Sequence, residues 1–127
     1  IMPRIADLFF KAAIAFLILG IVMGLQMSIS GDHTLSPAHA HLNLVGWVTM
    51  GLFGIYYALT PVAAASGLAK IHFWVALAGV VLIVPGIVMA VQGTSEAVAA
   101  IGSLLTLGSM LIFLVTVLRH GFGARTA

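Results

Sequence analysis

The sequence predicts an all-α integral membrane protein, a bundle of four helices that each cross the bilayer. Of the 127 residues, 62% are hydrophobic and only 6% are charged, whereas soluble domains run near one quarter charged residues. With a mean hydropathy of +1.24, the chain cannot cover a water-exposed surface. Its apolar residues fall into four runs, each long enough to cross a hydrocarbon core of about 30 Å. These four spans fill a single domain and leave room for little else.

The first two spans are separated by a short polar loop. Span one contains Gly20 and Gly24, a small-xxx-small pattern that lets two helices pack closely. After the loop, Ser36 suits an N-cap and Pro37 the first helical position, which places the start of span two. Thr60-Pro61 ends that span. The four spans are expected at residues 7–29, 37–59, 68–91 and 97–118.

The basic residues predict the orientation of the bundle. In this arrangement every Lys and Arg falls on one side, whereas Asp32 and Glu96 lie in loops on the other side. By the positive-inside rule both termini are expected in the cytoplasm, and the chain becomes a multi-pass protein of a bacterial-type inner (plasma) membrane. The lipid bilayer is then its main partner. The basic residues are Arg4, Lys11, Lys70, Arg119 and Arg125.

The composition excludes several kinds of chemistry. The chain has no cysteine, which excludes disulfides, thiolate metal sites, covalent c-type haem attachment and thiol catalysis. Five Lys and Arg residues are too few for a surface that binds nucleic acid. The chain contains no nucleophile–base pair and no identifiable pair of acid and base carboxylates. An enzyme that works alone is therefore not favoured.

Two histidines at the outer start of span two are the main candidates for chemistry. Imidazole is the commonest protein ligand for iron, copper and zinc, and polar groups inside a membrane are functional hypotheses by default. Because successive helical residues turn by 100°, His39 and His41 point about 200° apart and cannot chelate one ion. They should address two different neighbours: another span, a cofactor on each face or another subunit. Asn43 adds a polar group on the same helix, and its ordinary role would be an interhelical hydrogen bond.

The remaining histidines differ in depth. His33 lies in the outer loop, either as a solvated residue or as a further ligand. His72 lies near the inner side, and about 20 Å of depth separates it from His41, so one metal cannot bind both within one chain. For His72 we expect an interfacial position beside Lys70. For His120 we expect a favourable cation at a helix C-terminus.

The stretch Ala38-His39-Ala40-His41-Leu42-Asn43-Leu44-Val45-Gly46 resembles the His-x-His helix of the haem–copper oxidase and nitric oxide reductase catalytic subunits. Lys70-Ile71-His72-Phe73-Trp74-Val75-Ala76-Leu77-Ala78-Gly79-Val80 is similar to the next span of those subunits, and the order and direction match. The resemblance implies haem binding, with His39 corresponding to the ligand of the high-spin haem and His41 to that of the low-spin haem. The chain lacks the other copper-site histidines, a histidine in span one and the acidic proton-channel residues. It is therefore not expected to reduce oxygen or nitric oxide by itself.

The leading hypothesis is a b-type haem protein that transfers electrons or binds a gas. His41 would be the primary axial ligand, and His39 the alternative ligand or a second site, with Asn43 beside them. The missing ligand would come from the same helix of a second copy, which implies a homo-oligomer, from His33, or from a methionine of span one. Electron transfer would also need a redox partner. The methionines in question are Met23 and Met27.

Two alternatives stay open. His33, His39 and His41, with Met27 nearby, would suit a copper site at the outer face. The chain would otherwise be a non-catalytic membrane subunit of a larger complex, in which the histidines serve packing or proton-linked contacts.

Overall fold

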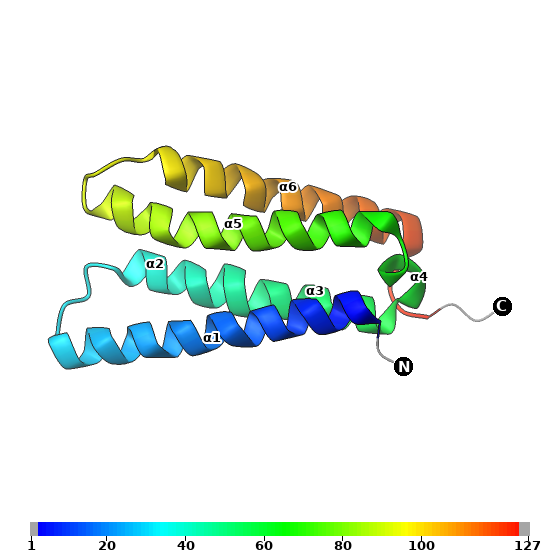
Figure 1. The fold of residues 1–127 in the computed structure, drawn as a ribbon, viewed down its shortest axis with the longest axis horizontal. Helices are drawn as coiled ribbons and strands as arrows, with labels where there is room; N and C mark the ends of the chain where they lie inside the picture. Colours follow the sequence, from blue (N-terminus) through cyan, green and yellow to red (C-terminus); the bar gives the residue numbers. More distant parts are fainter. Residues whose placement is uncertain (1–2, 125–127) are drawn as a thin grey trace.

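The computed structural model describes residues 3–124, and this part of the chain is all-helical (Figure 1). The four predicted spans fall on α1, on α2, η1 and α3 together, on α5 and on α6. Each of the four is long and apolar enough to cross a membrane, as a multi-pass membrane protein requires. The helices are α1 (Arg4–Ser30), α2 (Ser36–His41), the π-helix η1 (Leu42–Thr49), α3 (Met50–Leu59), α4 (Pro61–Ala64), α5 (Gly67–Val91) and α6 (Ala97–His120).

The ends of the helices follow from local chemistry, and they differ from the prediction at Ser36 and after Thr60. α1 ends at Gly31, whose positive φ of 70° lets its N–H bond the Met27 carbonyl at 3.0 Å. Ser36 is not the N-cap that the sequence predicts. It is already helical, and its hydroxyl donates to the His33 carbonyl at 2.7 Å instead. Thr60 ends α3 as expected, but Pro61 then begins the four-residue α4 inside the predicted loop.

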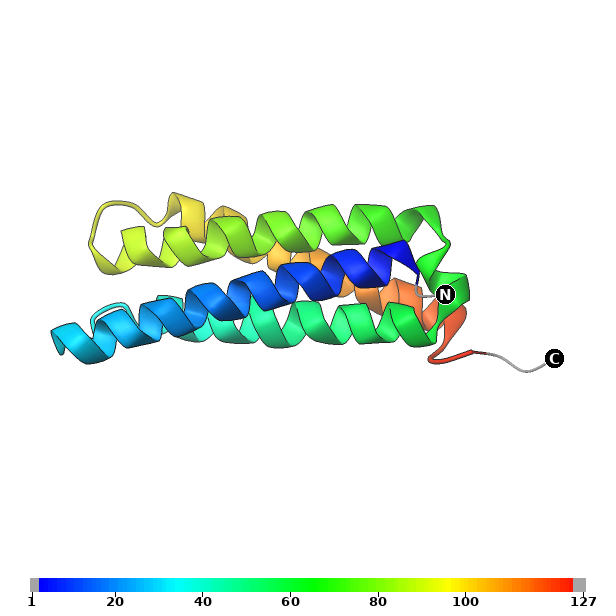
Figure 2. The same cartoon turned by 60° about the horizontal axis from the view of Figure 1, so that its bottom comes forward.

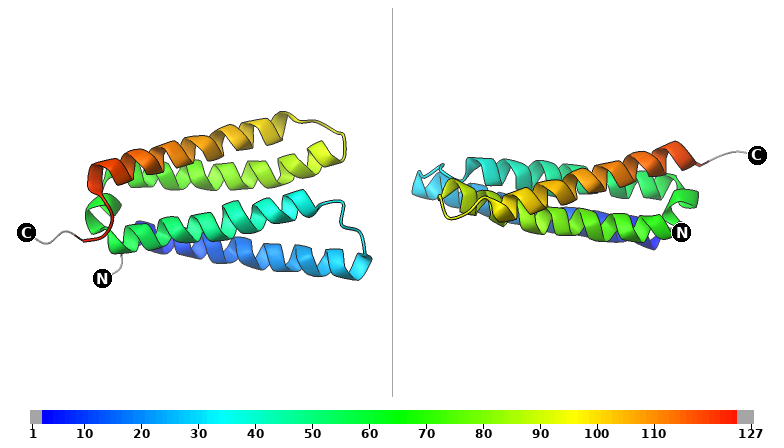
Figure 3. Two further views of the ribbon diagram at one scale, coloured as in Figure 1. Left: turned by 180° about the vertical axis from the view of Figure 1, so that it is seen from behind. Right: turned by 90° about the horizontal axis from the view of Figure 1, so that it is seen from above.

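The helices form two antiparallel hairpins. α1 packs against η1 and α3, and α5 packs against α6 along its length. In Figure 2, α1 lies between α5 and α3, with α6 behind. The loops 31–35 and 92–96 share one end of the bundle, while both termini and α4 lie at the other end (Figures 1 and 3). The structure thus brings Arg4, Lys70 and Arg119 to the end with the termini, while Arg125 lies outside the described residues.

Glycines set the close approach of α5 and α6. A Cβ atom built on Gly102 would lie 2.5 Å from the backbone nitrogen of Ile83. A Cβ atom on Gly79 would lie 3.0 Å from the Thr106 hydroxyl. A Cβ atom built on Gly86 would overlap the backbone of Ala99. The second hairpin is therefore held by direct backbone contact, the usual way to join helices when lipid weakens the hydrophobic effect.

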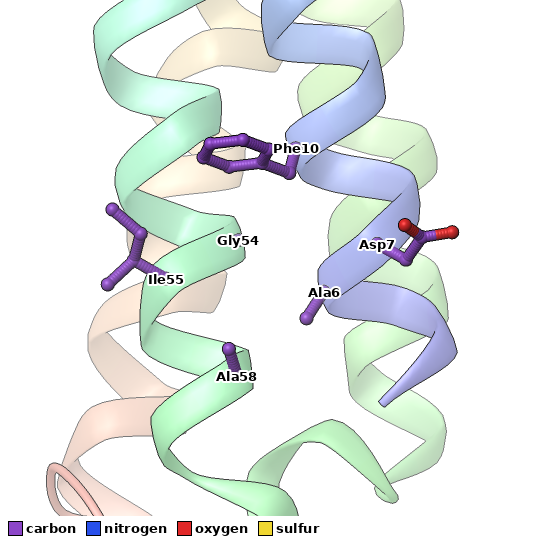
Figure 4. Close-up of a pocket in the computed structure, with 6 residues that line it drawn as sticks. All are labelled: Ala6, Asp7, Phe10, Gly54, Ile55 and Ala58. Carbon is purple, nitrogen blue, oxygen red and sulfur yellow. The ribbon is translucent and has the colours of Figure 1, made fainter. Parts of the chain in front are cut away.

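The first hairpin is joined through small residues as well. A Cβ atom built on Gly54 would lie 3.1 Å from the carbonyl oxygen of Ala6. Figure 4 shows these residues lining a groove of about 200 Å³ between α1 and α3. The Asp7 carboxylate turns away from α3 in that view and pairs with Lys11 at 2.8 Å. The groove is therefore an apolar surface, with no polar group aimed into it.

Candidate functional site

The helix that carries His39 and His41 changes its winding directly after them. From Leu42 to Thr49 the backbone forms a π-helix rather than an α-helix. Four residues of an α-helix overshoot a full turn by about 40°, so a strict four-residue spacing drifts across its surface. The wider π turn drifts in the opposite sense and so offsets it. As a result the buried residues of this segment are spaced four apart: Ala38, Leu42, Gly46 and Met50.

His39 and Asn43 lie on the side of this helix that faces α1. A Cβ atom built on Gly24 would lie 3.2 Å from the imidazole Cε1 of His39, and one on Gly20 would overlap the side-chain oxygen of Asn43. The Gly20–Gly24 pattern therefore does more than bring two helices together. It leaves the space in which α1 receives one imidazole and one amide.

The hydrogen bonds of this pair define the tautomer of His39. The Asn43 amide nitrogen donates to Nε2 of His39 at 3.3 Å, so in the neutral ring the proton sits on Nδ1. That Nδ1 atom is buried without a partner, and so is the Asn43 side-chain oxygen. Each orphaned polar atom costs about 1–3 kcal/mol. His39 is thus fixed against α1 with its Nε2 lone pair already used.

Replacing Gly20 with alanine is expected to disturb this pair. The new methyl group takes the place of the Asn43 oxygen, so the amide turns away and its bond to His39 is lost. We expect a loss of about 1 kcal/mol of stability, the typical net contribution of one hydrogen bond.

The effect is measured by unfolding the wild type, Gly20→Ala, Asn43→Ala and the double variant in detergent. In the Asn43→Ala background, where the amide is absent, Gly20→Ala should change stability much less. Equal losses in both backgrounds would contradict the contact.

His41 is held in the opposite manner. Its Nδ1–H donates to the carbonyl of Pro37 at 2.8 Å, one turn earlier on the same helix. A carbonyl only accepts, so Nδ1 carries the proton and Nε2 of the neutral ring keeps a bare lone pair. The side chain is half-buried, so this nitrogen is not sealed inside the bundle.

Residues that follow His41 at four-residue spacing face α5 and α6. Val45 and Thr49, four and eight residues later, line a gap against Ala76, Thr106 and Ser109 of those helices. This gap measures about 10 Å³, which is at the limit for a single water molecule. A large ligand of His41 would therefore bind at the outer end of the bundle rather than inside it.

The structure places two other predicted ligands in the loop and in α1. His33 is exposed in the loop, where its carbonyl accepts from Ser36. Met27 is buried in α1. Within residues 3–124, no three His, Asp or Glu side chains gather closely enough to hold a metal ion. His41 thus offers an open imidazole nitrogen at this end, and the exposed ring of His33 lies in the neighbouring loop.

The loop beside these residues carries a fixed negative charge. The hydroxyl and the N–H of Thr34 both donate to Asp32. These bonds, the hydroxyl first, lower the pKa of the Asp32 carboxyl below its usual value. Asp32 is therefore ionised next to His33 at neutral pH.

His72 is where the sequence-based prediction is wrong. It is not interfacial but fully buried, with 0% of its surface exposed. Its Nδ1 shares a hydrogen bond of 2.8 Å with the Tyr57 hydroxyl. The rings of Phe9, Phe53 and Phe113 surround it, with centroids 4.4–5.6 Å away. All four spans therefore meet around this one imidazole.

A signal for this burial is present in the sequence. Ala69 and Ala76 lie three residues before and four residues after His72, on one face of α5, and both are fully or nearly buried. Small residues on both sides of a polar residue indicate a face that approaches another helix. The neighbouring Lys70 and Trp74, which suggested an interface, lie on the exposed side instead.

The chain shows no match to a protein-family model, to a curated protein or to a solved structure.

Proposed function

We propose that the protein binds b-type haem at the outer end of the bundle, with His41 as an axial ligand. The observation that carries the proposal is the hydrogen bond from His41 Nδ1 to the Pro37 carbonyl. Histidines that ligate metals almost always donate their other ring N–H in this way, which fixes the tautomer and the ring orientation.

We infer that a second copy of the chain supplies the second iron ligand. His39 has its Nε2 engaged by Asn43, and His33 lies in the loop. The same His41 of a second copy offers an identical open nitrogen, so a two-fold pair of chains would supply two imidazoles to one haem. Two imidazoles would suit a haem that transfers one electron at a time, whereas a single imidazole would suit a haem that binds a gas. His39 and Asn43 then position the helix against α1.

The proposed haem site lies on the outer side of the membrane. The basic residues of the described chain gather at the end with the termini, which by the positive-inside rule faces the cytoplasm. His41 then lies toward the outer face, where a soluble redox partner could reach the haem.

Optical spectra of the purified protein test this function. After expression with added haem, the wild type should show a Soret band with about one haem per two chains. His41→Ala should lose the band, because Nε2 of His41 is the ligand. His33→Ala is the matched control and should keep it, since that ring lies in the exposed loop.

Two results would overturn the proposal. One is a wild-type protein without a Soret band, and the other is a band that His41→Ala leaves unchanged. Metal analysis of the same samples identifies the alternative: copper near one ion per chain, without iron, would favour a copper site.

A further inference from the structure

A second site lies at the opposite end of the bundle, where α1 and α5 both begin. A groove of about 280 Å³ runs between them beside α4. Arg4 and Lys70 line it, and both side chains are exposed. The rest of its lining is apolar and includes Leu8, Phe73 and Trp74. Two cations beside an apolar surface match the anionic headgroup and the acyl chains of a phospholipid.

No carboxylate of the described residues 3–124 lies within ion-pair distance of the two cations that line this groove. None of its lining residues is acidic. Among residues 3–124 the one ion pair joins Asp7 to Lys11, so neither Arg4 nor Lys70 has a carboxylate within ion-pair distance. The first turns of α1 and α5 also carry the positive ends of their helix dipoles, which adds to the field of the two side chains.

The aromatic wall fits a lipid better than a soluble anion. Trp74 is 65% exposed and packs edge-on against Phe73 at 5.3 Å. Tryptophan favours the boundary between headgroups and acyl chains. Leu8 continues the apolar wall away from the charges, along the lipid-facing side of α1.

We propose that this Arg4–Lys70 groove binds an anionic phospholipid, with its phosphate between the two cations and its acyl chains along Leu8 and Trp74. Basic pockets between membrane helices recognise anionic headgroups in this way. The site is independent of the haem proposal, because it lies at the other end of the bundle and uses none of the same residues.

Native mass spectrometry of the detergent-solubilised protein tests the groove. Dioleoyl phosphatidylglycerol and dioleoyl phosphatidylcholine are titrated separately, so that only the headgroup differs. A cation near the membrane surface contributes about 1 kcal/mol toward anionic lipid, so two should give a preference for phosphatidylglycerol of roughly tenfold or more. Arg4→Gln with Lys70→Gln should reduce this preference to about twofold or less.

Arg119→Gln is the control for a lost positive charge, because it removes a cation from the same end of the bundle without touching the groove. It should leave the preference unchanged. The proposal is overturned if the wild type binds both lipids equally. It is overturned as well if Arg119→Gln lowers the preference as much as the groove variant does. Displacement of phosphatidylglycerol by millimolar inorganic phosphate would show a site for a soluble anion instead.

Discussion

Gly102→Ala is expected to separate α5 from α6. The added methyl group would lie 2.5 Å from the backbone nitrogen of Ile83, and a backbone cannot turn aside as a side chain can. The two helices must then move apart along their contact. Overpacking of this kind typically destabilises by about 1–3 kcal/mol, occasionally more. Gly102→Leu should prevent the hairpin from forming.

Gly108→Ala on the same helix provides the control. A Cβ atom there meets only a methyl group of Val75, at 4.0 Å, an ordinary contact. Both variants change glycine to alanine in α6, so their difference isolates the contact with α5. Unfolding of the purified proteins in mixed micelles measures the stability of both variants. Equal stability of the two variants would show that α5 and α6 do not touch at Gly102.

His72→Ala is expected to destabilise the bundle by about 3–5 kcal/mol, because it combines a cavity with a lost hydrogen bond. The imidazole is enclosed by rings from the other three spans, so no single neighbour can move in to fill its volume. The Tyr57 hydroxyl also loses its histidine partner. Ile71→Ala, at the neighbouring lipid-exposed position, is the control and should change stability little.

A second pair of variants separates packing from polarity at this position. His72→Phe restores most of the volume but still leaves the Tyr57 hydroxyl without its imidazole, so it should cost about 1 kcal/mol. Adding Tyr57→Phe should recover most of that loss. The same unfolding measurement applies. A His72→Ala protein as stable as the wild type would contradict the burial of this ring.

The four spans could be predicted because hydropathy and length alone decide them. Lipid demands about 20 apolar residues in each crossing, and polar loops separate the four runs. The structure places its long helices where the sequence predicts them, and α1 begins only three residues earlier, at Arg4. The turn at Thr60-Pro61 was also readable, because the residue before a proline leaves the helical region.

The roles of single polar residues were harder to predict, because they depend on how each helix is rotated against its neighbours. Gly20 and Gly24 indicated close packing, but only the structure shows that the space holds Asn43 and His39. His72 looked interfacial because of its depth, although its face of α5 points into the core. For His39 and His41 the prediction of two different neighbours rested on the 100° turn of a regular helix. Both residues do lie in such a helix, α2.

The π-helix η1 sets how the part of the second span before it is rotated relative to the part after it. The outer part of this span orients the histidines, and its inner part orients the aromatic residues around His72, with η1 between them. Deleting one residue within 42–49 would restore ordinary α-helical winding and turn the outer part by about 100° relative to the inner part. The histidine end would then be rotated away from α1 while the aromatic end stayed in place. A gain or loss of one residue there would thus change the direction in which His39 and His41 point, while the packing around His72 stayed the same.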